Sequence, residues 1–261
     1  MSDDNRLSEL LLALKMPVAA RQIRQPTDPA LSLDATTLVV DALQAEVHER
    51  QERKRQRLQR QSQLPHGKTF DSWDSGRVPL RVSQKLRELT TGAFLATGDN
   101  ILCFGLPGRG KTHAAAALGH ALVATGHSVL FLPAFRLVQQ LLDAKRQCQL
   151  PKALAKLDSF ELIILDDIGY IQQTADEIEV LFTLLAERYE RRSLLITSNL
   201  VFSEWNRIFH HPMTTAAAID RLVHHCTVLE FTGRSLREEE AQRRHDADVS
   251  SPKAANQGAT A

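Results

Sequence analysis

The sequence predicts an α/β protein whose core is a parallel sheet, and three observations lead to this fold class. A glycine-rich stretch at residues 105–112 separates an apolar run from an alanine-rich helix. Apolar runs then alternate with amphipathic helices as far as about residue 199. One of these runs ends in two aspartates, Asp166 and Asp167. Such alternation indicates parallel strands with helices on both faces.

The glycine-rich stretch has the spacing of a phosphate-binding loop, Gly-x-x-x-x-Gly-Lys-Thr. It follows the strand expected over 101–104 and opens the helix expected from Lys111. Successive backbone N–H groups can then face one anion, with the helix dipole behind them. Lys111 would reach the outer phosphates, and Thr112 would offer its hydroxyl to Mg²⁺. The predicted nucleotide-binding residues are Gly105, Leu106, Pro107, Gly108, Arg109, Gly110, Lys111 and Thr112.

Length and composition exclude several classes of protein. The chain has 261 residues and a net charge of +1, so any nucleic-acid surface must be local. Cys103, Cys148 and Cys226 show no Cys-x-x-Cys spacing, which favours a reducing compartment over a disulfide framework or a zinc site. No apolar run has the ~18 residues needed to cross a bilayer, and the first residues lack the features of a secretory signal. We therefore expect a cytoplasmic protein with no membrane partner.

Residues 1–62 predict a small helical domain for DNA binding or oligomerisation. Leucines at helical spacing precede Pro17, and a longer helix starts near Asp34 with an apolar stripe. The second half of this helix is strongly basic. Its candidate DNA contacts are Arg50, Arg53, Lys54 and Arg57. The alternative is a solvated helix face, which is what charge runs commonly form.

Residues 63–80 predict a connector, and the domain with the phosphate-binding loop is expected over 81–240. Phe70 and Trp73 in the connector either stack on bases or pack the connector against that domain. A single helix is expected from 82 to 96, leading directly into the first strand.

Three further strands are expected beyond the phosphate-binding loop, at residues 128–132, 162–167 and 193–196. Helices are expected at 135–142, 151–157 and 175–191. Three arginines at the end of the last helix suit its dipole: Arg188, Arg191 and Arg192.

The acids after the third strand match a Walker B element. The end of this strand would place Asp166 near the Mg²⁺ held by Thr112. Asp167 would lie beside the γ-phosphate, where it could polarise an attacking water. The alternative is that both acids only cap a turn. Asn199, at the tip of the fourth strand, is the candidate to hold the water or sense the γ-phosphate, with a plain turn residue as the alternative.

Several segments carry a family resemblance. They are the phosphate-binding loop, LIILDDIGY at 162–170, RYERRSLLITSN at 188–199, FSEW at 202–205, IDRL at 219–222 and FTGRSLR at 231–237. In this order they resemble IstB-type ATPases, the AAA+ transposition helper proteins of insertion sequences, which are related to DnaC-type helicase loaders. The resemblance runs from about residue 7 to residue 237. It implies strand order 5-1-4-3-2, ATP and Mg²⁺ as cofactors, and DNA-stimulated ATP hydrolysis.

The resemblance also implies partners. It implies assembly of several copies on double-stranded DNA, as a ring, spiral or filament, and assistance to a cognate transposase. A DnaC-like helicase loader and a nucleotide-gated DNA-binding scaffold with little hydrolysis are the alternatives, because an ATP-binding site does not reveal which process its hydrolysis drives.

The matching motifs assign residue roles. By resemblance, Asp166 is the metal-side acid, Asp167 the catalytic acid and Asn199 the sensor. Arg221 matches the arginine-finger position, which would act on the ATP of a neighbouring subunit. The alternative for Arg221 is a salt bridge within its own chain. Arg237 matches a sensor-like arginine only weakly, since these proteins are similar to AAA+ members that lack the usual lid.

Initiator-type AAA+ proteins carry a helical element between the second and third strands that lines the nucleic-acid channel. The resemblance therefore implies further DNA contacts at Lys145, Arg146, Lys152 and Lys156. An exposed amphipathic helix pair is the alternative.

Two histidine pairs and the end of the chain complete the sequence. The pairs at 210–211 and 224–225 are not expected to bind metal, because adjacent side chains diverge and no acid complements them at a known spacing. Residues 241–261 contain few apolar side chains to bury and are expected to be a disordered tail.

Overall fold

The structure is a computed structural model that describes residues 3–24, 35–170, 174–200, 204–205 and 212–232. The chain divides into two compact units, residues 1–60 and 61–261. The predicted tail lies outside the described residues, as do Arg237 and the histidine pair at 210–211. None of the described helices is both long and apolar enough to span a bilayer.

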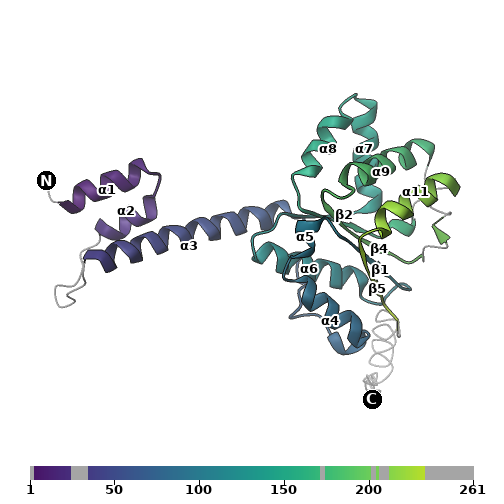
Figure 1. Ribbon diagram of the computed structural model, residues 1–261, viewed down its shortest axis with the longest axis horizontal. Helices are drawn as coiled ribbons and strands as arrows, with labels where there is room; N and C mark the ends of the chain where they lie inside the picture. Colours follow the sequence, from purple (N-terminus) through teal and green to yellow (C-terminus); the bar gives the residue numbers. More distant parts are fainter. Residues whose placement is uncertain (1–2, 25–34, 171–173, 201–203, 206–211, 233–261) are drawn as a thin grey trace, which may run out of the picture. The chain divides into compact units, whose positions relative to one another are not determined.

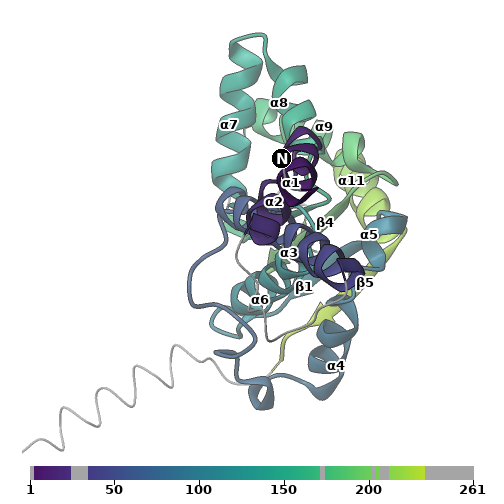
Figure 2. The ribbon, with the colours of Figure 1, turned by 90° about the vertical axis from the view of Figure 1, so that its left-hand side faces the viewer.

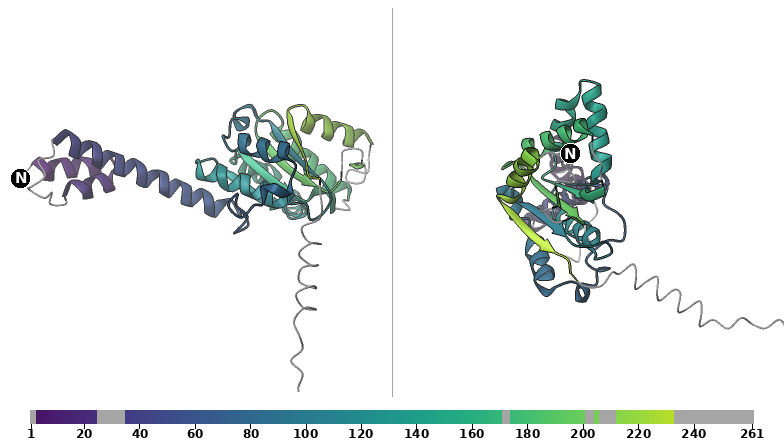
Figure 3. Two further views of the ribbon diagram at one scale, coloured as in Figure 1. Left: turned by 90° about the horizontal axis from the view of Figure 1, so that it is seen from below. Right: turned by 90° about the vertical axis from the view of Figure 1, so that its right-hand side faces the viewer.

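The N-terminal unit consists of α1 (Asp3–Ala13), α2 (Pro17–Arg24) and α3 (Ala35–Gln61). Within this unit α1 and α2 lie alongside the first half of α3 (Figure 3). A small buried cluster joins the three helices, formed by Leu11, Ala19, Ala20 and Ala42. The alanines allow close approach of the helix backbones, so little apolar area is needed to hold the unit together.

A buried carboxylate also connects these helices. Glu46, on α3, accepts the backbone N–H groups of Val18 (2.7 Å) and Ala19 (3.3 Å), which belong to the first turn of α2. These donors have no partner inside their own helix, and an anion at a helix N-terminus is favourable. Burial raises the pKa of Glu46, but the hydrogen bonds from Val18, Ala19 and Arg50 outweigh burial and leave that pKa below its usual value.

The second unit is built on a five-stranded parallel sheet. Its strands are β1 (Asn100–Phe104), β2 (Val129–Pro133), β3 (Leu162–Asp166), β4 (Ser193–Ser198) and β5 (Cys226–Glu230). Their spatial order is β2-β3-β4-β1-β5, and all four pairings are parallel. This confirms the expected order 5-1-4-3-2, read from the other edge. The sequence did not locate β5, because this edge strand buries only Leu229 and lacks an apolar run.

Helices cover both faces of the sheet (Figure 1, Figure 2). On one side lies α6 (Lys111–Ala124), with α4 (Leu80–Leu89) packed against it. On the other side lie α7 (Ala134–Arg146), α8 (Leu150–Asp158), α9 (Ala175–Arg188) and α11 (Pro212–Val223). The four alanines that open α6 are fully buried, so this helix approaches the strands closely. That approach positions the first turn of α6 at the end of β1.

The helix expected over 82–96 is two helices. The chain forms α4 and then the short α5 (Phe94–Thr97), and Gly92 lies between them with a φ of 74°. A Cβ at Gly92 would lie 2.7 Å from His127 Nε2, so only glycine fits this turn. Helical periodicity continues through such a break, which is why it was not predicted. Two 3₁₀ turns, η1 (Ser75–Arg77) and η2 (Ile168–Tyr170), complete the described elements.

Arg188 does not act as the exposed dipole cation that its helix-end position suggested. It is 1 % exposed and donates hydrogen bonds to the carbonyls of Leu157, Phe160, Glu161 and Ser193. Burial lowers the pKa of the guanidinium to about 9, which leaves it charged at neutral pH. Arg188 therefore ties the end of α8 to the starts of β3 and β4. The helix ends here, three residues earlier than expected, and Glu190 follows with a φ of 56°.

Candidate nucleotide-binding site

The phosphate-binding loop connects the end of β1 to the start of α6, as its spacing predicts. Its glycines adopt positive φ angles, 146° at Gly105, 77° at Gly108 and 86° at Gly110. A Cβ on Gly105 would lie 2.3 Å from the carbonyl oxygen of Phe231, beside β5. The loop can therefore curl against the sheet only because this position lacks a side chain.

Lys111 extends from the first turn of α6 across the loop to the tip of β4. Its side chain is nearly buried, and its Nζ donates to the carbonyls of Gly105 and Leu106 (2.9 Å for Leu106) and to Asn199 Oδ1 at 2.6 Å. Carbonyl and amide oxygens thus hold the ammonium at the position where a phosphate oxygen would compete for it.

The two acids lie on the adjoining strand end. Thr197 on β4 donates its hydroxyl to Asp166 Oδ1 (2.7 Å) and accepts the backbone N–H of Asp167 (2.8 Å). Asp167 has a φ of 63°, an uncommon conformation for a residue with a side chain. Asn199 Nδ2 then donates to Asp167 Oδ1 at 3.1 Å. Sequence reasoning chose Asn199 at this tip and missed Thr197, although both residues follow the apolar part of one strand.

These side chains meet because parallel strands end at the same edge of a sheet. A cavity of about 160 Å³ lies there. Its lining comprises Lys68, Pro107, Gly108, Arg109, Gly110, Lys111, Thr112, His113, Asp167, Thr197 and Asn199. Pockets that enclose a whole small ligand are larger, about 300 Å³ or more. The cavity therefore suits the phosphate end of a nucleotide.

The residues present fit a nucleoside triphosphate with Mg²⁺. The loop offers N–H groups and a lysine, Thr112 offers a hydroxyl, and Asp166 and Asp167 offer carboxylates at the neighbouring strand end. Arg109 also lines the cavity, and its buried Nε has no hydrogen-bond partner among the described residues. A site that places donors opposite paired acids is what a metal–triphosphate requires.

Known proteins with similar sequences identify the family of this chain. The IstB-like ATP binding protein family matches residues 6–244. The chain belongs to this family. An insertion sequence ATP-binding protein of Sinorhizobium fredii is 47 % identical over 204 residues, covering 76 % of this chain and 68 % of the relative. The insertion sequence IS21 ATP-binding protein of Pseudomonas aeruginosa is 35 % identical over 241 residues, covering 92 % of this chain and 91 % of the relative.

Solved structures are similar in fold. The DnaC helicase loader covers 64 % of this chain with a TM-score of 0.57 and 18 % identity, and 98 % of that loader is matched. The replication initiator DnaA, bound to AMPPCP and single-stranded DNA, covers 74 % of this chain with a TM-score of 0.56 and 14 % identity, and 59 % of DnaA is matched. At these identities the likeness supports the AAA+ fold of the IstB-like chain.

Arg221 lies at the opposite edge of the sheet from the phosphate-binding loop. It belongs to the last turn of α11, where Asn100, the first residue of β1, donates to the carbonyls of Leu222 and His225. The five residues of β1 separate the two edges by ~13 Å. The Arg221 guanidinium stacks 4.6 Å from the centre of the Phe182 ring, and its buried Nη1 has no hydrogen-bond partner among the described residues. Within one chain of this family, Arg221 is therefore remote from the cavity.

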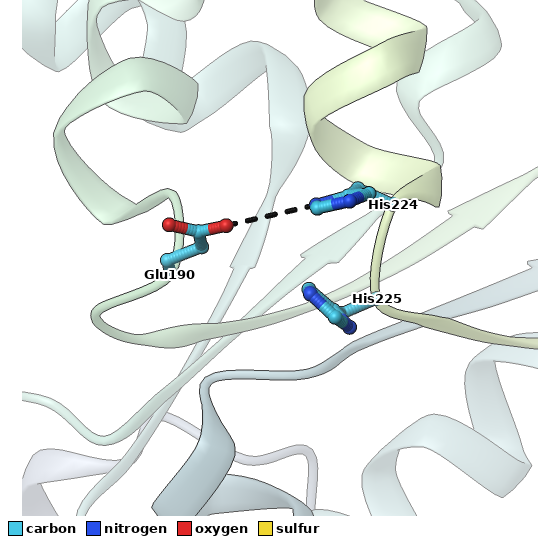
Figure 4. A group of neighbouring side chains, drawn as sticks. All are labelled: Glu190, His224 and His225. Carbon is cyan, nitrogen blue, oxygen red and sulfur yellow. Dashed lines mark ion pairs between the residues drawn. The ribbon is translucent and has the colours of Figure 1, made fainter.

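The histidine pair at 224–225 lies at the same edge as Arg221 and does not diverge as expected. The two ring centroids are 4.3 Å apart, and Glu190 supplies the carboxylate that sequence spacing did not show (Figure 4). His224 Nδ1 is 3.6 Å from Glu190 Oε1 and 2.9 Å from the Tyr189 hydroxyl. All three members are exposed, with one ligand atom of each within 4.8 Å of the others. The contacts within this surface cluster are thus the Glu190–His224 ion pair, the Tyr189–His224 hydrogen bond and the ring contact between the two histidines.

The predicted DNA contacts on α7 and α8 differ in whether their charges are paired with acids of the same chain. Lys145 pairs with Asp176 (3.0 Å) and Glu179 (2.8 Å) on α9, and these carboxylates raise the pKa of Lys145. Arg146 lies 3.6 Å from Asp143 on its own helix. Lys152 and Lys156 are exposed on α8 and make no ion pair in the part of the chain that the structure describes. Of these four predicted contacts, the two on α8 are therefore the ones without an ion pair among the described residues.

The predicted DNA contacts on the basic half of α3 also divide into cations with an acidic partner and cations without one. Arg50 pairs with the buried Glu46 at 2.9 Å and donates to the carbonyl of Lys15, so it holds the N-terminal unit together. Arg53 pairs with Glu49 one turn earlier, also at 2.9 Å. Lys54 and Arg57 are exposed without an ion pair among the described residues. Two of the four predicted contacts on α3 therefore have an acidic partner within the chain and two have none among the described residues.

Proposed function

We propose that the cavity binds ATP with Mg²⁺ and hydrolyses it. The Lys111–Asn199–Asp167 chain of hydrogen bonds, which joins the phosphate-binding loop to both neighbouring strand ends, is the observation that supports this most directly. Thr112 and Asp166 would hold Mg²⁺, which neutralises charge on the phosphate oxygens. Asp167 would take a proton from the attacking water, and Asn199 would orient that water.

We infer further that ATP-loaded copies assemble on double-stranded DNA and assist a transposase. Support for the transposase comes from the relatives, which are insertion sequence proteins matched over up to 98 % of their own length. Support for DNA comes from the unneutralised cations on α3 and α8, since such cations bind phosphates with release of counterions. The likeness to a helicase loader concerns the fold alone. Helicase loading is therefore an alternative that an experiment would test.

Arg221 would complete the site of a neighbouring copy. The end of α11 lies beside the first residue of β1, away from the cavity of its own chain, which favours a contact with phosphate in a second subunit. An arginine brought across an interface neutralises charge that develops on the transferred phosphoryl group. The half-buried guanidinium would leave the Phe182 ring to do so. In mixed assemblies, an Arg221→Ala subunit combined with an Asp167→Asn subunit should recover part of the ATPase activity.

ATPase assays and electron microscopy of the full chain would test this function. Turnover should require Mg²⁺ and rise on addition of duplex DNA, and an ATP analogue that resists hydrolysis should yield rings, spirals or filaments on the duplex. A preference for single strands would favour a helicase loader. ATP-dependent DNA binding with no stimulated turnover would favour a scaffold, and failure to bind ATP would overturn the whole proposal.

A further inference from the structure

A lysine from outside the phosphate-binding loop lines the nucleotide cavity. Lys68 belongs to the stretch predicted as a connector, yet it lines the same cavity as Lys111, Asp167 and Asn199. The side chain is partly buried and makes no hydrogen bond or ion pair among the described residues. A partly desolvated cation without a partner, beside an anion cradle, is the arrangement expected of a group whose partner is the ligand.

The residues around Lys68 are held firmly against α6. We call residues 64–73 the strap. His120 Nε2 lies 3.1 Å from the carbonyl oxygen of Pro65, and His113 Nε2 lies 3.0 Å from that of Thr69. Leu64 is buried against Gly119, where a Cβ would come within 2.7 Å of the leucine side chain. The strap is therefore attached along about two turns of the helix that begins at the phosphate-binding loop.

The strap also forms a closed loop around Lys68. The Ser72 hydroxyl accepts the Thr69 N–H at 3.1 Å, donates to the Gly67 carbonyl and lies 3.1 Å from His113 Nε2. Gly67 makes the turn with a φ of 75°. Phe70 and Trp73 pack edge to face on each other, with ring centroids 5.6 Å apart. A cation presented by such a loop loses little conformational entropy when it binds.

We propose that Lys68 is a second cationic contact for the outer phosphates of the nucleotide, supplied by the strap and not by the phosphate-binding loop. The inference rests on the proposed function, because it requires a nucleotide in this cavity. The lining favours the phosphates over the base as the contact, since Pro107 is the one apolar side chain among the described residues that line the cavity. The contact of Thr69 with His113, in the first turn of α6, holds the neighbouring Lys68 near the end of the helix where phosphates would bind.

A comparison of the affinities for three nucleotides would distinguish a phosphate contact from other roles of Lys68. The full chain, Lys68→Gln, Lys68→Arg and the matched control Lys85→Gln would be titrated calorimetrically with a non-hydrolysable ATP analogue, ADP and AMP. Lys85 is a suitable control because it is a lysine of the same unit whose ion pair is with Glu88 on its own helix. Thermal unfolding without nucleotide would show whether each variant is folded.

Lys68→Gln should weaken binding of the ATP analogue roughly 10- to 100-fold, the usual cost of losing a charge-assisted hydrogen bond. The loss should be smaller for ADP and smallest for AMP, because each has fewer phosphates. Lys68→Arg should keep most of the affinity, and Lys85→Gln should equal the parent. The unfolding midpoint without nucleotide should be the same for all four proteins.

Four outcomes would overturn the assignment. Equal binding by Lys68→Gln and the parent would remove Lys68 from the site while leaving the proposed function intact. An equal loss for all three nucleotides would place the contact on a part that all three share, the base, the ribose or the α-phosphate, and not on the outer phosphates. A lowered unfolding midpoint would make Lys68 a structural residue. A parent protein that binds none of the nucleotides would overturn both the proposed function and this inference.

Discussion

Charged residues at the cavity and charged residues on the basic helices differ in what holds them. At the cavity, Lys111, Asp167 and Asn199 come from three elements and bond to one another. On α3, arginines such as Arg53 pair with acids one turn away on the same helix. A charge held from several elements is pre-organised for a ligand, whereas a pair on an exposed helix contributes little and is screened by salt. The position of a charge in the fold therefore says more about function than its sign.

The largest effect is expected at Lys111. Lys111→Ala should abolish ATP binding at millimolar nucleotide, because the ammonium is the cation held inside the loop by the Leu106 carbonyl and Asn199. Calorimetric titration with ATP would measure this. The paired Arg53→Ala is the contrast and should bind ATP as the parent does. Comparable ATP affinity in Lys111→Ala and the parent would remove the reason for treating the two regions differently.

Asp167→Asn should separate binding from chemistry. The amide can still accept from Asn199, so ATP should bind with nearly the parent affinity, but it cannot take a proton from water. The turnover number should fall by roughly 10²- to 10⁴-fold. Steady-state hydrolysis and equilibrium binding, measured on the same preparation, would show the split. Unchanged turnover would mean that Asp167 is not the base.

Glu46 tests, away from the cavity, whether a charge held from several elements matters more than a charge paired on one exposed helix. Glu46→Gln should speed hydrogen exchange at the first turn of α2, since two N–H groups lose their charged acceptor, whereas Glu49→Gln should have little effect. The pKa of Glu46 is lowered in the folded chain, so its stabilisation is complete above the unfolded value near 4.5 and is lost as pH falls through the folded value. Exchange at this turn should therefore accelerate, beyond its intrinsic pH dependence, only at acid pH. Identical exchange in both variants would argue against the buried cap.

The smallest effect is expected on α8. The double variant Lys152→Ala, Lys156→Ala should weaken duplex DNA binding and lower the slope of log affinity against log salt by about 2, if each lysine neutralises one phosphate. Lys145→Ala should leave the slope unchanged, because Asp176 and Glu179 already neutralise that lysine. Salt titrations of DNA binding would measure both. A larger change in slope for Lys145→Ala than for the double variant would mean that Lys145, and not the two lysines of α8, contacts DNA.

Local patterns in the sequence were sufficient for the phosphate-binding loop, its flanking strand and helix, and the acids at the end of β3. Spacing and alternation encode these features over a few residues. The strand order was correct as well, although it came from the family resemblance. The basic stretches stay a prediction as DNA contacts, and the sequence alone did not show that Arg50 contacts Lys15 or that Lys145 contacts α9.

Only the tertiary structure decided which distant residues share a site. Thr197 reaches both acids because β3 and β4 are neighbours, Arg188 is buried because four carbonyls converge on it, and Lys68 lines the cavity because the strap packs on α6. The physical reason is that hydrogen bonding and burial depend on which strand ends and helix faces meet. By itself the sequence determined the chemistry of the loop and acids, and the packing of the chain determined which further residues join them.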